Sequence, residues 1–183
     1  SRNGVLSLFN LNSQEFVWKR TLTENKDETF QMKYLSRNLL VYSQNRAMVL
    51  NTRGHTNYEV DFESLFDKIP TALSAAFLNF AHNIFSVFAS GNQVAFYQGT
   101  SYVNTIRLEL GAQAIGLLPE ENSVLVICKH NKGLKTYRVN METLSSEVIG
   151  EANDIPDSWE HQLTSNMLVL SKDHLTQKVL DVR

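Results

Sequence analysis

The sequence lacks the short motifs that position most enzymatic chemistry. It contains no Gly-x-Ser-x-Gly elbow, no phosphate-binding glycine-rich loop and no Gly-x-Gly-x-x-Gly fingerprint. Acyl transfer, nucleotide hydrolysis and dinucleotide binding therefore lack their usual positioning elements. We predict no intrinsic enzymatic activity and no tightly bound cofactor.

An excess of charge of one sign is also missing. The 183 residues include 17 lysines and arginines and 19 acidic residues, giving a net charge of −2 with both signs scattered along the chain. Without a basic stripe the sequence does not point to nucleic acid or to an anionic membrane surface. The most apolar stretch, 72–89, is interrupted by polar residues and is not expected to span a bilayer. We expect protein partners.

Metal-ligand spacing is absent as well. No two of the five histidines have a zinc-like spacing; they are His55, His82, His130, His161 and His174. An acidic cluster comprises Glu147, Glu151, Asp154, Asp157 and Glu160. Paired carboxylates there could bind a hard cation or exchange protons, but Pro156 and the missing calcium-loop spacing favour a solvated connection. We assign no catalytic, cofactor-binding or metal site.

The one cysteine, Cys128, excludes an intrachain disulfide and ends the apolar run 124–128. A buried, inert thiol is expected there, with a reactive thiol as the alternative. No Asn-x-Ser/Thr glycosylation acceptor is present. These two features leave the cell compartment open.

Short β-forming runs separated by turn residues dominate the sequence. They group into three sets of four: 30–35, 39–42, 47–50 and 58–60; then 73–80, 84–88, 93–97 and 103–108; then 112–118, 123–128, 134–139 and 145–149. The sets begin at 30, 73 and 112, close to the spacing of ~40–45 residues that is typical of a four-stranded propeller blade.

The ends of the chain carry fewer strands. Two are expected before the first set, at 4–9 and 16–20, and three after the last, at 161–163, 167–170 and 175–182. We predict an all-β fold of β-propeller blades with four-stranded antiparallel repeats, forming one segment, 1–183, of a larger propeller. Its parts are a partial blade at 1–21, blades at 28–61, 72–109 and 111–150, and a partial blade at 160–183.

A β-sandwich or barrel is the alternative fold, since it also shows many short strands. The long connections at 61–72 and 150–160 favour blade-to-blade crossings. Within 61–68 the apolar residues Phe62, Leu65 and Phe66 have helical spacing before Pro70, which predicts one or two helical turns.

The opening hairpin is the most patterned stretch. Phe16 and Trp18 are two residues apart on a strand, so period two places them on one face, and both are expected to be largely buried. Such a hairpin resembles the repeat of quinoprotein-type propellers, or is simply amphipathic with an aromatic core residue. The Trp-Asp repeat signature is absent, because Trp159 is followed by Glu160.

Three stretches carry a family resemblance. They are the hairpin 5–20, the run 123–128, and Leu134-Lys-Thr-Tyr137 with Glu142-Thr143. Together they resemble the luminal N-terminal propeller of subunit 1 of the endoplasmic reticulum membrane protein complex. One departure is the turn Asn12-Ser13-Gln14, where that family usually has Thr-Gly.

The resemblance implies a non-catalytic scaffold and interaction domain in the endoplasmic reticulum lumen, within a membrane complex that acts as an insertase for membrane proteins. Its partners would be other subunits and membrane-protein clients, and it would meet the membrane only through the rest of the complex. Two alternatives stay open: a cytosolic β-propeller adaptor of a trafficking or nuclear-pore assembly, and a quinoprotein-like enzyme fragment.

Overall fold

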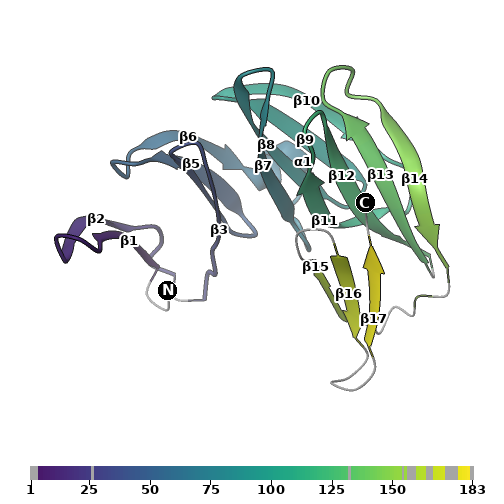
Figure 1. Ribbon diagram of the computed structural model, residues 1–183, viewed down its shortest axis with the longest axis horizontal. Helices are drawn as coiled ribbons and strands as arrows, with labels where there is room; N and C mark the ends of the chain where they lie inside the picture. The colour runs from purple at the N-terminus through teal and green to yellow at the C-terminus, as the bar shows by residue number, and fades with distance from the viewer. Residues whose placement is uncertain are drawn as a thin grey trace. The chain divides into compact units, whose positions relative to one another are not determined.

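The computed structural model describes residues 4–25, 27–131, 133–153, 155, 160–163, 167–171 and 177–181 (Figure 1). Over these residues the chain forms seventeen strands and one short helix. None of the described residues belongs to a helix long and apolar enough to cross a membrane. The chain divides into two compact units, Ser1–Thr71 and Ala72–Arg183.

The first unit contains a hairpin and a four-stranded antiparallel sheet. The hairpin consists of β1 (Val5–Asn10) and β2 (Glu15–Thr21). The sheet has the order β3-β4-β5-β6, with strands β3 (Gln31–Leu35), β4 (Asn38–Tyr42), β5 (Arg46–Asn51) and β6 (Thr56–Asp61).

One face of the hairpin packs on this sheet. The core of the contact comprises Val41, Met48 and Leu50 of the sheet, with Leu6, Trp18, Leu22, Phe30 and Leu39 packed against it. Arg46 of β5 adds a polar contact, because its Nη2 donates to the carbonyl of Leu22, the residue after β2, at 2.6 Å. The hairpin is therefore fixed to the sheet by both apolar and polar contacts.

Helix α1 (Phe62–Phe66) follows β6 and confirms the predicted helical turn. Asp61 caps its start, since Oδ1 accepts from the backbone N–H of Ser64 at 2.8 Å. That hydrogen bond is the main cause that lowers the pKa of Asp61. The helix ends at Asp67 in the left-handed region, φ 59°, and both of its phenylalanines are buried.

The second unit contains three antiparallel sheets. The first has the order β10-β9-β8-β7, with β7 (Ser74–Phe80), β8 (Asn83–Ser90), β9 (Gln93–Gln98) and β10 (Ser101–Arg107). The next has the order β11-β12-β13-β14, with β11 (Gln113–Pro119), β12 (Ser123–His130), β13 (Gly133–Asn140) and β14 (Ser146–Ala152). The last has the order β15-β16-β17, with β15 (Glu160–Leu163), β16 (Met167–Ser171) and β17 (Gln177–Asp181).

Strand β12 is buried on both of its faces. Val126 and Cys128 belong to a core shared with the β7–β10 sheet, which includes Val87 and Phe96. Ile127, pointing the other way, packs with residues of β16 in a second core. A strand covered on both faces needs apolar residues at every position rather than at every second one, which explains the continuous run 124–128.

The β15–β17 sheet approaches β11 closely at Gly116. A Cβ atom added there would overlap the side chain of Leu163. Gly116 also follows a β-bulge, because Ala114 pairs with Cys128 and Gly116 with Ile127, which leaves Ile115 without an opposite residue. Glycine at 116 thus allows two neighbouring sheets to pack at short distance.

Each predicted set of four strands is one four-stranded antiparallel sheet, which confirms the all-β prediction and the four-stranded repeat. The two-strand group is the hairpin, and the last group is the three-stranded sheet, although parts of the strand expected at 175–182 lie outside the described residues. That residues 1–183 form one segment of a larger propeller stays a prediction.

Candidate interaction site

The hairpin contains a β-bulge that reorients its side chains. Leu8 pairs with Trp18 and Phe9 pairs with Phe16, so that Val17 has no opposite residue. A bulge breaks the simple alternation of faces along a strand. The prediction that Phe16 and Trp18 are both largely buried is therefore wrong for Phe16, which is 54% exposed, while Trp18 is partly buried.

Side chains on the inner side of the hairpin form hydrogen bonds to the turn between β5 and β6. Nε1 of Trp18 donates to the carbonyl of Thr52 at 3.0 Å, and Nη1 of Arg20 donates to the carbonyl of Gly54 at 3.1 Å. Gly54 has φ 77°, and a Cβ added to it would lie 2.7 Å from Cδ2 of Trp18. Only glycine fits this turn without strain, because both the backbone angle and the indole ring exclude a side chain.

The outer side of the hairpin carries an aromatic and cationic group that we call the hairpin cluster, made of Phe9, Phe16 and Lys19. The two rings meet edge to face, with centroids 5.2 Å apart and planes at 71°. Nζ of Lys19 lies 3.6 Å from the centroid of the Phe16 ring, in cation–π contact. The three side chains thus contact one another although they are exposed.

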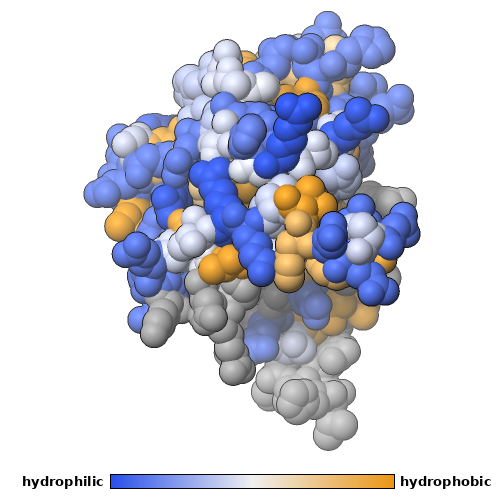
Figure 2. Space-filling model, turned by 90° about the vertical axis from the view of Figure 1, so that its left-hand side faces the viewer, coloured by the Kyte–Doolittle hydropathy of each residue, from blue (hydrophilic) through white to orange (hydrophobic). Residues whose placement is uncertain are grey.

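Exposed apolar side chains concentrate on this hairpin. Among the described residues, five of the thirteen large apolar side chains that reach solvent lie there: Leu8, Phe9, Leu11, Phe16 and Val17. Figure 2 shows apolar side chains at the surface between polar ones. Exposed apolar side chains gathered on one element are typical of a protein interaction site.

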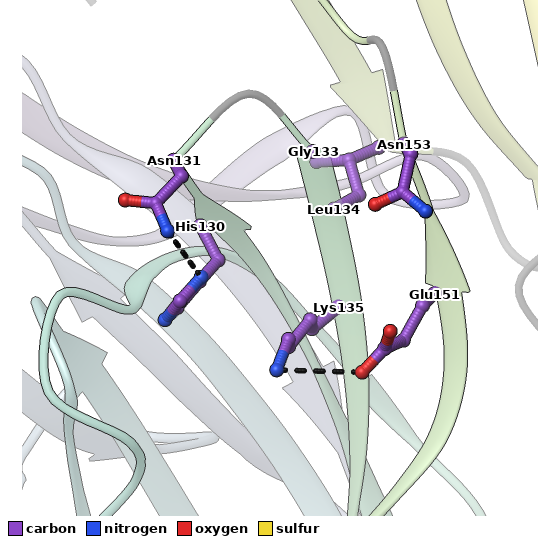
Figure 3. Close-up of a pocket in the computed structure, with 7 residues that line it drawn as sticks. All are labelled: His130, Asn131, Gly133, Leu134, Lys135, Glu151 and Asn153. Atoms are coloured by element: carbon purple, nitrogen blue, oxygen red, sulfur yellow. Dashed lines mark hydrogen bonds and ion pairs between the residues drawn. The ribbon is translucent and has the colours of Figure 1, made fainter.

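A second candidate is a polar depression of about 490 Å³ at the end of the β11–β14 sheet. Figure 3 shows its lining, which comprises His130, Asn131, Gly133, Leu134, Lys135, Glu151 and Asn153. Nζ of Lys135 bonds to Glu109 at 2.8 Å and lies 3.3 Å from Glu151. Nε2 of His130 lies 3.3 Å from the carbonyl oxygen of Leu110.

The charges around this depression neutralise one another. The hydrogen bond from Lys135 lowers the pKa of Glu109, and the same contact raises the pKa of Lys135. Tyr137 is buried nearby; burial, and then the negative charge of Glu109, raise its pKa to about 12. Its hydroxyl lies near the Glu109 carboxylate but is not within hydrogen-bond geometry of any described residue. The arrangement ties the loop after β10 to β13.

The histidines whose side chains the structure describes do not come together. His55 and His82 are exposed, and His130 lines the polar depression. The backbone of His161 belongs to β15, but its side chain and the whole of His174 lie outside the described residues.

The described members of the acidic cluster do not gather either. Glu147 lies 3.7 Å from Arg138, Glu151 pairs with Lys135, and Glu160 is exposed. Asp154 and Asp157 lie outside the described residues. Within the part of the chain that the structure describes, no three metal-ligating side chains gather. Sequence reasoning did not find Glu109, since only the fold brings it to Lys135.

Comparison with known proteins gives a fold and no family. No family model matches the chain, and no curated protein matches it. A solved structure of the Pan2 WD40 domain from Neurospora crassa superposes with a TM-score of 0.61 at 12% identity, covering 100% of this chain and 57% of that one. The chain has the β-propeller fold.

Two further propellers are similar. BBS1N, solved in complex with ARL6DN, gives a TM-score of 0.60 at 14% identity over 99% of this chain and 59% of its own. A complex of the fission yeast SREBP–SCAP binding domains gives 0.61 at 9% identity over 99% of this chain and 56% of that chain. At these identities the likeness concerns the fold alone, and the chain spans little more than half the length of each structure.

Proposed function

We propose that this chain is a non-catalytic interaction scaffold that contributes to the luminal side of the endoplasmic reticulum membrane protein complex, or of a closely similar insertase. The observation that carries the scaffold part is the solvent-exposed hairpin cluster, whose side chains contact one another, on a β-propeller. A propeller is a stack of rigid sheets, so a hairpin fixed to it presents its side chains without first being ordered.

The similar structures give general support for a protein partner. Two of them are described by a protein complex, BBS1N with ARL6DN and the SREBP–SCAP binding domains. Each of these complexes is a property of the similar protein and not of this chain. For this chain they favour binding to other proteins over a reaction on a small molecule.

The compartment rests on the sequence resemblance. The stretch 5–20 is the hairpin, 123–128 falls within β12, and Leu134 to Tyr137 fall within β13. The resemblance therefore covers the exposed hairpin and two strands that carry buried side chains. The cytosolic adaptor is the competing function, since the propeller fold serves that role equally well.

Glycosylation of an added acceptor distinguishes the two compartments. Asn12 is exposed in the hairpin turn, and Gln14→Ser would complete an Asn-x-Ser acceptor with it, in a sequence that otherwise has none. In cells expressing the full-length protein, we expect the variant to gain a glycan that an endoglycosidase removes. It should also co-purify with the membrane complex.

The matched controls are Gln14→Ala, which creates no acceptor, and the double variant Asn12→Gln with Gln14→Ser. Neither should gain this glycan. An unmodified Gln14→Ser protein that fractionates with cytosol would overturn the luminal assignment and favour the adaptor. A stoichiometric quinone or calcium ion in the purified protein would instead support the quinoprotein-like alternative.

A further inference from the structure

We infer that the outer side of the hairpin is a docking surface for a protein segment that carries apolar anchor residues next to carboxylates. This inference deepens the proposed scaffold function and rests on it. The surface consists of the hairpin cluster, Phe9, Phe16 and Lys19, with Leu11 and Val17 beside it.

The apolar part of the surface has the properties of a binding hot spot. Phe16 is 54% exposed and Val17 is 55% exposed, yet the strand that carries them is anchored from its inner side by Trp18 and Arg20. Rigid aromatic side chains lose little conformational freedom when a partner covers them. A partner with apolar anchors would bury both phenylalanine rings at small entropic cost.

The charges around the surface indicate which charge a complementary partner would carry. Lys19 is exposed on β2 beside the Phe16 ring, and Arg53 is exposed in the turn between Thr52 and Gly54. Neither of these two cations forms an ion pair with a carboxylate among the described residues. Glu15 is the one acidic residue of the hairpin. A partner that supplies carboxylates would therefore find complementary, unpaired cations.

A membrane surface is a less suitable occupant. The hairpin tip, which would enter a bilayer first, contains Asn12, Ser13, Gln14 and Glu15 beside a single leucine. The other apolar side chains lie behind this tip, on the strands. Inserting them would require the polar tip to pass into hydrocarbon, which is unfavourable. A protein segment lying across the strands meets the phenylalanines directly.

The experiment uses a peptide display library against the full-length protein, with counter-selection on the double variant Phe9→Ser/Phe16→Ser. We expect the retained peptides to combine two or more apolar residues with Asp or Glu. A synthetic peptide of the retained sequence should bind the double variant at least about tenfold more weakly. Lys19→Glu/Arg53→Glu should weaken it too, and added salt should weaken wild-type binding.

The matched control is Leu110→Ser, which removes an apolar side chain that is 92% exposed elsewhere in the chain. Its binding and its melting temperature should equal those of the wild type. Failure to retain any peptide that distinguishes wild type from the double variant would overturn the inference, as would retained peptides rich in lysine. Sedimentation of wild type, but not of the double variant, with phosphatidylserine vesicles would also overturn it in favour of a membrane.

The two proposals fail in different experiments. If the Phe9→Ser/Phe16→Ser protein still co-purifies with the luminal complex in wild-type amount, the scaffold function stands and the docking surface is wrong. An unmodified Asn12 in the Gln14→Ser protein bears only on the compartment.

Discussion

The β1–β2 hairpin and the β11–β14 sheet use the same kind of strand in opposite ways. In β12 every residue from Val124 to Cys128 is buried, because a sheet covers each of its faces. The hairpin packs on one face only, and its apolar residues on the other reach solvent. Apolar character alone therefore does not distinguish core from interface in this fold; the number of neighbouring sheets does.

The largest expected effect is the difference in stability loss between truncating a phenylalanine in the core and truncating one on the hairpin. Phe88 on β8 is fully buried, whereas Phe16 is 54% exposed. Phe88→Ala should lower the free energy of unfolding by about 3–5 kcal/mol, since it leaves a cavity. Phe16→Ala removes one ring contact and one cation–π contact and should cost about 1 kcal/mol or less. Urea unfolding of both variants measures the difference, and equal costs would show that the hairpin is as buried as the core.

A medium effect on stability is expected in the turn between β5 and β6, which contacts the hairpin. Gly54→Ala meets both a left-handed backbone, which costs about 1–2 kcal/mol, and the Trp18 ring, which adds overpacking of about 1 kcal/mol or more. Gly99→Ala is the matched control, because Gly99 has φ 56° with no atom within 4 Å. Thermal unfolding should show Gly54→Ala to be the more destabilising. An equal loss of thermal stability in both variants would show that the contact with the Trp18 indole adds nothing to the cost.

The third prediction concerns the reactivity of the Cys128 thiol rather than the stability of the fold. Burial raises the pKa of Cys128 from 9.0 to about 12, so almost no thiolate exists in the native protein at neutral pH. Cys128 should react with a thiol reagent only after unfolding, while Val17→Cys in a Cys128→Ala background should react at once. Rapid labelling of native Cys128 would contradict its burial.

The sign of the related pH effect follows from the same shift. Between pH 9 and about 12 the unfolded chain loses the Cys128 proton while the native chain keeps it. The contribution of this thiol to stability therefore decreases as the pH rises through that window. Cys128→Ala should reduce the slope of unfolding free energy against pH there.

Much of the fold follows from the sequence because strand periodicity and turn residues are local signals. The three groups of four strands and the single helical turn were predictable from them, as was the burial of Cys128, which lies in a run apolar on both faces. The outward position of Phe16 was not predictable. It depends on the bulge between Leu8 and Phe9, which is a property of the pairing register rather than of the residues on either strand.

The contacts of the candidate sites were less predictable still. Glu109 reaches Lys135 across 26 positions of sequence, and Trp18 reaches Thr52 across 34. Neither pair carries a spacing that a periodic pattern could reveal. Local patterns thus predict which strands form, whereas the packing of sheets on sheets determines which side chains meet.

The double-sided burial of β12 has a consequence for the newly made chain. A stretch of five apolar, strongly β-forming residues without proline or charge is the kind of segment that stacks into intermolecular cross-β aggregates when it is exposed. Glu120 and Glu121 precede it and Lys129 follows it, so charged gatekeepers flank the stretch on both sides. The residue pattern that stacks the sheets so tightly therefore also makes this strand a ready target for chaperones until both neighbouring sheets have closed over it.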